Sequence, residues 1–213
     1  MLNLFTGWYS STRDFENELC LINNILNPLI NKIYLLSEDS KPFPKNEKVV
    51  GIITDKKPTY NIFFEIINQL DSDISIISNS DIYFDETLKH VFNLQENECY
   101  ALTRWDVLED NTIELFDRKD SQDVWIFKNK IKDIDGDFNL GIWGCDNRIA
   151  YEIQKAGYII LNPSLSIKSF HIHKRIPTTG KSKRIPKPYF YIKPSYLKEN
   201  KEACWLTKMN YLK

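Results

Sequence analysis

The segment Ile74–Asp85 constrains the fold of this chain more than any other, because it changes abruptly from apolar to polar. Residues Ile74–Ile77 are apolar and mostly β-branched, a pattern that predicts a central strand covered on both faces. In an open α/β sheet, ligands bind beyond the carboxyl ends of such strands. Asn79, Ser80 and Asp81 come just after this strand, and their oxygens suit a divalent metal that carries phosphates. We therefore expect a ligand site here.

Two carboxylates of this segment also have purely structural interpretations. Asp81 can form the turn after the strand instead of binding a ligand. Asp85 precedes Glu86–Leu88, which favour a helix, so we interpret Asp85 as a helix N-cap. Evidence from the other segments of the chain is needed to choose between these two roles of Asp81.

The composition is that of an ordinary globular protein. Of 213 residues, 42% are hydrophobic and 27% are charged, with a formal net charge of −1. This balance gives no electrostatic reason to expect nucleic acid or an anionic membrane as a partner. The four cysteines are Cys20, Cys99, Cys145 and Cys204. They are scattered, which predicts free thiols in a reducing compartment. The chain carries no leader pattern and no apolar run of membrane-spanning length, so we expect a soluble, cytoplasmic protein.

Strand and helix patterns alternate along the first part of the chain. The expected strands are Leu2–Phe5, Lys32–Leu36, Val49–Ile53 and Ile74–Ile77, and the expected helices are Arg13–Leu26 and Thr59–Leu70. This βαβαβ order implies an α/β fold with a parallel, doubly wound sheet and right-handed crossovers, as in nucleotide-binding proteins. Neither glycine-rich phosphate motif, GxGxxG or GxxxxGKS/T, is present. A bound diphosphate would therefore be neutralised by a metal or by basic side chains.

Both expected helices carry apolar residues at helical spacing. In Arg13–Leu26 these residues are Phe15, Leu19, Ile22 and Leu26, and in Thr59–Leu70 they are Phe63, Ile66, Ile67 and Leu70. For the second helix we expect these side chains on the inner face.

The second half of the chain adds further strands and two informative carboxylates. We expect strands at Cys99–Thr103, Ser121–Phe127, Ile159–Pro163 and Ser169–His173, helices at Glu86–Leu94 and Asn147–Lys155, and a polar hairpin or loop over residues 108–120. Asp123 lies at a strand entry and Asp146 at a helix start, where each can act on a ligand or serve only as a turn or cap residue. Trp143 is a candidate platform for a sugar ring or a plain core residue.

Two histidines share one face of the last expected strand. His171 and His173 are two residues apart, so strand alternation places them about 7 Å from each other. Such a pair can bind a metal or a phosphate, and its alternative is a structural role. We interpret the basic segment Lys174–Lys193 that follows as a solvated loop or as a lid over an anionic ligand.

Taken in order, these segments resemble the GT-A glycosyltransferases over most of the chain, from about Lys57 to Arg175. The motifs that carry the resemblance are Lys57-Pro58-Thr59-Tyr60, Asn79-Ser80-Asp81-Ile82-Tyr83-Phe84-Asp85, Ala101-Leu102-Thr103-Arg104-Trp105, Ser121-Gln122-Asp123-Val124-Trp125-Ile126-Phe127, Gly144-Cys145-Asp146-Asn147-Arg148-Ile149-Ala150-Tyr151-Glu152, Ala156-Gly157-Tyr158, Asn162-Pro163-Ser164 and His171-Ile172-His173. Asn79-Ser80-Asp81 is similar to the Asp-X-Asp motif of that family, with Asn79 in place of the first carboxylate.

The resemblance implies a GT-A-like fold that binds a nucleotide sugar, with UDP-hexose as the default donor, through Mn²⁺ or Mg²⁺. Asp81 would be the principal metal ligand, with Asn79 beside it and His171 or His173 completing the site. The donor-binding residues implied in this way are Thr6, Gly7, Trp8, Glu38, Asp39, Thr54, Asp55, Tyr60, Asn79, Ser80, Asp81 and Arg104. Because Asn79 carries no charge, the metal would be held less tightly than by two carboxylates.

The same resemblance gives roles to the two other carboxylates. Asp123 would contact hydroxyls of the donor sugar, and Asp146 would face the acceptor. A metal would stabilise the departing diphosphate, and Asp146 would accept the proton of the acceptor hydroxyl if the reaction inverts the anomeric centre. In a retaining enzyme, Asp146 or Asp123 would instead orient the acceptor or the donor.

The expected function is transfer of a hexose-type sugar from a nucleotide sugar to a hydroxyl of a glycan or glycoconjugate. One domain would span residues 1–213, with a nucleotide-binding part at about 1–100, an acceptor- and metal-completing part at about 101–193 and a tail at 194–213. Three alternatives stay open. A sugar nucleotidyltransferase usually has a glycine-rich loop that is missing here, and a metal hydrolase would need more ligands. A carbohydrate- or nucleotide-sugar-binding protein with a decayed transferase site would share only the fold.

Overall fold

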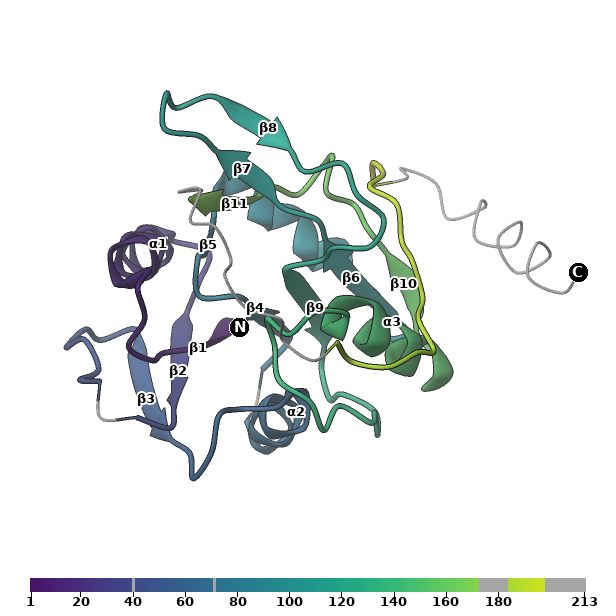
Figure 1. Ribbon diagram of the computed structural model, residues 1–213, viewed down its shortest axis with the longest axis horizontal. Coiled ribbons are helices and arrows are strands. Elements are labelled where there is room, and N and C mark those ends of the chain that lie inside the picture. The colour runs from purple at the N-terminus through teal and green to yellow at the C-terminus, as the bar shows by residue number, and fades with distance from the viewer. Residues whose placement is uncertain (40, 71, 173–183, 198–213) are drawn as a thin grey trace, which may run out of the picture.

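The computed structural model describes residues 1–39, 41–70, 72–172 and 184–197 (Figure 1). Its largest element is a sheet of seven strands in the order β10-β6-β9-β4-β1-β2-β3. These strands are β1 (Leu2–Gly7), β2 (Lys32–Ser37), β3 (Val49–Ile53), β4 (Ile74–Ser78), β6 (Glu98–Leu102), β9 (Val124–Lys128) and β10 (Ile159–Leu161). Strands β3, β2, β1 and β4 are parallel, and β10 is parallel to β6. The expected α/β fold with a mostly parallel sheet is confirmed, and β9 is its antiparallel member.

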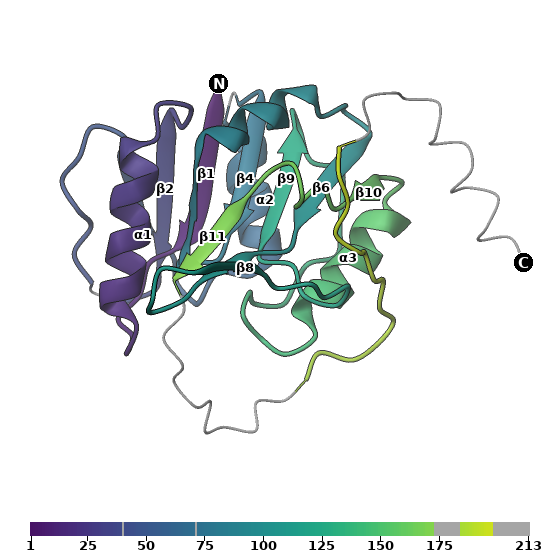
Figure 2. The ribbon, with the colours of Figure 1, turned by 90° about the horizontal axis from the view of Figure 1, so that it is seen from above.

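Helices cover both faces of this sheet and enclose a hydrophobic core on each side (Figure 2). They are α1 (Asp14–Leu26), α2 (Tyr60–Gln69), α3 (Cys145–Lys155) and the 3₁₀ helix η1 (Glu86–Asn93). Helices α1 and η1 contribute to one core, and α2 and α3 contribute to the other. The neighbours Leu4 and Phe5 of β1 point into opposite cores, as strand alternation requires. No helix within the described ranges is long and apolar enough to cross a membrane.

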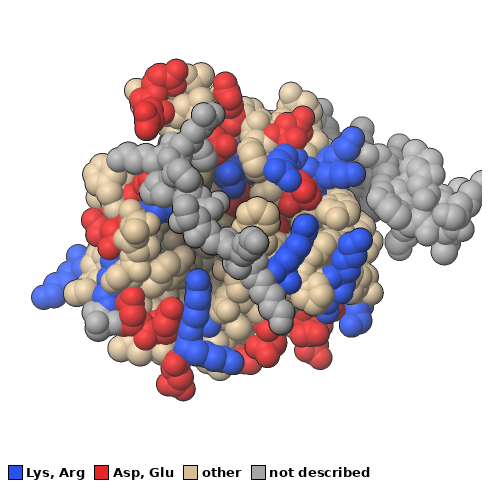
Figure 3. Space-filling view, in the orientation of Figure 1, with Lys and Arg blue, Asp and Glu red and all other residues tan. Residues whose placement is uncertain are grey.

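Several local expectations are confirmed. Asp85 caps η1, because its carboxylate accepts the backbone N–H of Thr87 at 2.9 Å. Phe63 and Ile67 of α2 are buried in the second core, with Ile66 and Leu70 partly buried against it. The cysteines that the structure describes are buried free thiols: Cys20, Cys99 and Cys145. Acidic and basic side chains are interspersed on the face shown in Figure 3, in keeping with the near-neutral composition.

A smaller sheet of four strands packs against α1, in the order β5-β11-β7-β8. Its strands are β5 (Ile82–Phe84), β7 (Trp105–Val107), β8 (Ile113–Leu115) and β11 (Ser169–Ile172). Strands β7 and β8 form a hairpin whose turn lies in the expected 108–120 region. Strand β11 is antiparallel to β5 and parallel to β7, and its register pairs His171 with both Ile82 and Asp106. His171 therefore lies between the segment that follows Asp81 and the strand that carries Asp106. His173 lies outside the described residues.

Helix α1 turns a polar side inward and its apolar stripe outward. Phe15 and Leu26 are 67% and 73% exposed, whereas Asn17 and Asn24 are buried. The apolar spacing thus predicts the helix but not the face that it buries. The reason lies in the smaller sheet, where the outer edge of β5 has no neighbouring strand among the described residues.

Asparagines of α1 satisfy the backbone groups at that edge. Asn24 donates its Nδ2–H to the carbonyl of Ile82 at 2.8 Å, and its Oδ1 accepts the N–H of Phe84 at 3.2 Å. Asn27, just after the helix, donates to the carbonyl of Phe84 at 3.1 Å. An amide side chain offers one donor and one acceptor, so Asn24 pairs with the strand as a backbone amide would. These contacts fix β5 and, directly before it, Asp81.

We predict that Asn24→Leu lowers the free energy of unfolding by roughly 2 kcal/mol or more, because two buried backbone groups lose their partners. Urea unfolding followed by circular dichroism measures the change. Asn23→Leu is the matched control on the same helix, since the Asn23 amide donates to the carbonyl of Leu19 at an exposed position. That variant should shift stability by no more than about 0.5 kcal/mol. Equal effects of the two substitutions would contradict the role given to Asn24.

Candidate active site

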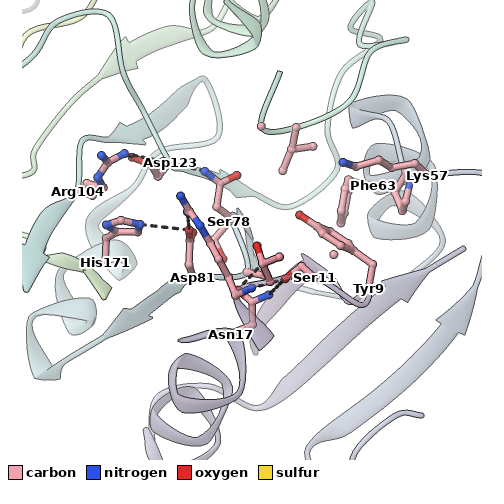
Figure 4. Close-up of a pocket in the computed structure, with 18 residues that line it drawn as sticks. Tyr9, Ser11, Asn17, Lys57, Phe63, Ser78, Asp81, Arg104, Asp123 and His171 are labelled. Atoms are coloured by element: carbon pink, nitrogen blue, oxygen red, sulfur yellow. Dashed lines mark hydrogen bonds and ion pairs between the residues drawn. The ribbon is translucent and has the colours of Figure 1, made fainter. Parts of the chain in front are cut away.

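A cavity of about 490 Å³ lies at the carboxyl ends of β1 and β4 (Figure 4). Gly7 and Ser78, the last residues of these two strands, are part of its wall. Asn79, Ser80 and Asp81 continue the wall beyond β4. The volume is within the range of pockets that bind small molecules. The cavity therefore lies where the sequence of the organising strand predicts a ligand site.

Asp81 is held from two sides by positive groups. Arg13 donates from Nη1 to Asp81 Oδ2 at 3.0 Å, and His171 Nε2 lies 3.2 Å from the same oxygen. The other ring nitrogen of His171, Nδ1, lies 2.8 Å from Asp106 Oδ1. His171 is 5% exposed, so the imidazole is buried between two carboxylates. This arrangement follows directly from the register of β11 between β5 and β7.

Arg104 extends this network to a third carboxylate. Its Nε donates to Asp106 at 2.8 Å, and its Nη1 lies 3.3 Å from Asp123 Oδ2. Asn79 donates from Nδ2 to the other oxygen of Asp123 at 2.7 Å. Burial raises the pKa of Asp123 and the charge of Asp81 adds to this effect, while Arg104 and His171 oppose it. Positive and negative groups thus alternate along one wall of the cavity.

The other pKa values follow from the same contacts. Burial opposes ionisation of Asp81, but the hydrogen bond and charge of His171 and the charge of Arg13 outweigh it and lower that pKa. Burial also opposes ionisation of Asp106, yet His171 and Arg104 lower its pKa to about 2. Burial lowers the pKa of His171, but the hydrogen bonds to Asp106 and Asp81 raise it to about 9. In this arrangement the imidazole is protonated near neutral pH.

Asp81 and His171 have the spacing that a divalent metal needs. Oδ2 and Nε2 lie 3.2 Å apart. Adjacent ligands of an octahedral ion with bonds of about 2.1 Å are separated by about 3 Å. Asp106 at Nδ1 supplies the carboxylate that orients a metal-binding imidazole, and a metal would replace the proton on Nε2. Among the described residues, no group of three or more His, Cys, Asp or Glu is arranged to hold a metal. An ion here would therefore use two protein donors and complete its shell with phosphate oxygens and water.

Asp146 lies in the first turn of α3, close to Asp123. The N-cap of this helix is Gly144, whose φ of +85° favours glycine, so the interpretation of Asp146 as the cap is wrong. The Asp146 carboxylate accepts hydrogen bonds from the Cys145 thiol at 3.1 Å and from the backbone N–H of Gln122. Burial and the charge of Asp123 raise the pKa of Asp146 to about 7. A carboxylate with this pKa is well matched to accept a proton near neutral pH.

Trp143 belongs to the loop before Asp146. Its side chain is 61% exposed, so the core interpretation is wrong. Leu140 and Gly141 of the same loop line the cavity. Trp143 therefore presents a large exposed ring at the protein surface, two residues from the cavity wall along the chain.

Two aromatic residues expected at the donor site lie in the cores instead of the cavity wall. Trp8 is 3% exposed and donates from Nε1 to the carbonyl of Pro42 at 3.1 Å. Tyr60 is 1% exposed, and its ring contacts those of Trp125 and Phe138 edge-on. Both rings fill space in the hydrophobic cores, and the sequence motifs alone do not indicate this burial.

The remaining expected donor residues divide between the cavity and its surroundings. Those that line the cavity are Gly7, Asn79, Ser80, Asp81 and Arg104, together with Asp123 and His171. Those outside its lining are Thr6, Glu38, Asp39, Thr54 and Asp55, at the ends of β1, β2 and β3. Strand β3 is the edge strand of the sheet, and β1 and β2 lie between it and β4.

The cavity also has lining residues that the sequence analysis missed. They include Tyr9, Ser11, Arg13, Asn17 and Lys57, and Asp106 contacts His171 Nδ1 from outside the lining. The Lys57 ammonium lies 4.9 Å from the centre of the Tyr9 ring. The sequence held one usable signal, which is that Asn17 lies on the polar side of an amphipathic helix and Arg13 directly precedes that helix. Asp106 comes into place only through the pairing of β7 with β11.

No protein-family model and no curated protein sequence matches this chain. Among solved structures, the mannosyltransferase PcManGT from Pyrobaculum calidifontis, in complex with GDP-Man and Mn²⁺, aligns with 84% of this chain at 10% identity and a TM-score of 0.52. TarS 1–349 from S. aureus aligns with 91% at 9% identity and a TM-score of 0.50. This chain covers only 58% and 60% of those two chains.

These likenesses establish the fold and nothing narrower, because both identities are far below 25%. The chain has a GT-A-like, Rossmann-type α/β fold, similar to that of the mannosyltransferase. The fold implied by the sequence motifs is therefore confirmed, whereas the roles of individual residues stay predictions.

We predict that Asp146→Asn stabilises the protein at alkaline pH. The native pKa is raised to about 7 from 3.8, so the native state retains a proton that the unfolded chain releases as the pH rises between these values. The wild type therefore loses stability over this interval, and asparagine has no charge to bury. The gain from Asp146→Asn should be roughly 2 kcal/mol larger at pH 8 than at pH 5.

Urea unfolding at the two pH values measures this difference. Asp133→Asn, at an exposed carboxylate, controls for the loss of one negative charge. A gain from Asp146→Asn that is the same at pH 5 and pH 8 would contradict the raised pKa.

Proposed function

We propose that this protein is a metal-dependent glycosyltransferase that moves a hexose-type sugar from a nucleotide sugar to a hydroxyl of a glycan or glycoconjugate. The observation that carries the proposal is the pair of Asp81 and His171 at the carboxyl end of β4, in the wall of a ligand-sized cavity. The GT-A-like fold supports it, as does the neighbour of that fold that holds GDP-Man and Mn²⁺. We take UDP as the nucleotide of the donor, because the resemblance to GT-A glycosyltransferases implies it.

In this proposal Asp81 and His171 hold Mn²⁺ or Mg²⁺, with Asn79 in the position of the missing first carboxylate. The bound ion would act as a Lewis acid that stabilises the leaving diphosphate. His173 stays a candidate ligand beyond the described residues. Arg13 and Lys57 add positive charge to the cavity wall, where it would attract the diphosphate of the donor.

In this proposal Asp123 would accept hydrogen bonds from hydroxyls of the donor sugar. Arg104 and Asn79 hold its two oxygens in place from the protein side. Asp146 would accept the proton of the acceptor hydroxyl in an inverting reaction, for which its pKa of about 7 is suited. In a retaining reaction, Asp146 or Asp123 would orient the acceptor or the donor.

We predict that Asp81→Ala abolishes metal-dependent binding of the donor. A panel of UDP- and GDP-sugars is tested by thermal unfolding with Mn²⁺ and with EDTA, and a ligand at a hundred times its Kd stabilises the wild type by about 2.7 kcal/mol. The variant should lose this shift and the slow hydrolysis of the nucleotide sugar, while its circular dichroism spectrum is retained. Asp133→Ala is the control. Unchanged hydrolysis in Asp81→Ala would refute the proposal, and binding without turnover in the wild type would favour a decayed transferase site.

We predict that Trp143→Ala weakens the acceptor and not the donor. An aromatic platform contributes about 1 kcal/mol, so the KM for a saccharide acceptor should rise between about fivefold and tenfold. Trp143→Phe should restore most of the loss, because a smaller ring remains. Steady-state transfer to a saccharide panel, compared with hydrolysis of the donor in the absence of acceptor, separates the two effects. An equal loss of transfer and hydrolysis would contradict an acceptor role for Trp143.

A further inference from the structure

Arg13 is a cation that the resemblance to glycosyltransferases does not assign, and it lines the cavity. Its backbone is fixed, because its N–H donates to Ser11 Oγ at 3.1 Å and its carbonyl accepts the N–H of Asn17 at 3.0 Å. Its side chain is 35% exposed, and its Nη1 lies 3.0 Å from Asp81 Oδ2. The guanidinium is thus attached to a rigid point but remains able to change its contacts.

The oxygen that Arg13 contacts is the one that a metal would need. Arg13 Nη1 and His171 Nε2 both lie against Oδ2 of Asp81. A divalent ion bound between Asp81 and His171 would meet the guanidinium at close range, and two cations at that distance repel each other. Arg13 and the metal therefore compete for Asp81.

A second carboxylate gives Arg13 an alternative partner. Glu16 is one turn further along α1, is 3% exposed, and its Oε2 lies 3.9 Å from Arg13 Nε. Within the described part of the chain, this oxygen accepts no hydrogen bond. Glu16 would keep the guanidinium at the edge of the cavity once Arg13 has left Asp81. The terminal nitrogens of Arg13 would then be available to an anion, and a guanidinium binds phosphate oxygens through paired hydrogen bonds.

We propose that Arg13 exchanges Asp81 for the diphosphate of the donor when the metal binds, which makes metal and nucleotide bind cooperatively. The inference rests on the proposed function, since it requires a metal-bound nucleoside diphosphate in the cavity. Without nucleotide, Arg13 screens Asp81 from free metal. The diphosphate draws Arg13 away, and the metal then takes its place on Asp81. By linkage, each ligand strengthens the binding of the other by the same factor.

The test is a titration of Mn²⁺ followed by the electron paramagnetic resonance signal of the unbound ion. Mn²⁺ is titrated alone, then with UDP and with GDP, into the wild type, Arg13→Gln and Arg13→Lys. Arg118→Gln is the matched control, because Arg118 pairs with Asp120 on the surface and does not line the cavity. Circular dichroism and thermal unfolding check that each variant is folded.

Arg13→Gln should bind Mn²⁺ alone about tenfold more tightly than the wild type, within the usual range of coupling between sites. The extra affinity that a nucleoside diphosphate gives to Mn²⁺ should shrink by a similar factor. Arg13→Lys should lie between the wild type and Arg13→Gln, because the charge remains but the paired hydrogen bonds of the guanidinium are lost. Arg118→Gln should match the wild type.

Two results would overturn the inference, and a different one would overturn the proposed function. If nucleotide strengthens Mn²⁺ binding equally in the wild type and Arg13→Gln, Arg13 does not carry the coupling. If Arg13→Gln binds Mn²⁺ more weakly, Arg13 supports the metal instead of competing with it. If neither nucleotide changes Mn²⁺ binding in any variant, including those with Arg13 intact, the metal-dependent donor site itself is refuted.

Discussion

Three carboxylates at the centre of this structure, one buried and two partly buried, each contact cations that offset the cost of removing their charge from water. The carboxylates are Asp81, Asp106 and Asp123, and the cations are Arg13, Arg104 and His171. An ionised carboxylate without a partner in such a place would cost several kcal/mol, so each side chain depends on its neighbours in the chain of contacts. The contacts join α1, the end of β4, β7, β11 and the entry to β9, which makes the cavity wall a meeting point of distant segments.

The smaller sheet positions a central member of this network, His171. In the register of this sheet, His171 of β11 pairs with Asp106 of β7 on one side. On the other side it pairs with Ile82 of β5, the residue that follows Asp81. Asp146 shows the contrasting case, because burial and the charge of Asp123 dominate there and its pKa rises to about 7. Two kinds of carboxylate thus lie close together. His171 and an arginine lower the pKa of Asp81 and of Asp106, whereas the pKa of Asp146, about 7, lets this group exchange a proton near neutral pH. Separate environments of this kind allow similar side chains to perform different tasks.

The sequence predicted most of the large sheet, because β-branched runs and helical spacing are local signals. It also pointed to Asp81, Asp123 and His171, which line the cavity, and to Asp146, which lies in the first turn of α3. It missed Arg13 and Asp106, whose positions depend on pairing between segments far apart in the chain. Trp8 lies in the core and not in the cavity wall for a related reason, because a ring next to a strand end can turn into the core as easily as toward a ligand. The sequence also did not predict which face of α1 is buried, because that face is determined by the backbone groups of β5 that the helix satisfies.

The contact between α1 and β5 has a further consequence for the behaviour of the protein in solution. An unpaired strand edge is a template on which another chain can add a strand, and it leads to edge-to-edge aggregation. Asn24 and Asn27 occupy the backbone groups of β5 that such a strand would need. The helix therefore acts as a surrogate neighbour for the strand and closes this side of the smaller sheet. The same two asparagines that fix β5 thereby protect the molecule from self-association through this strand.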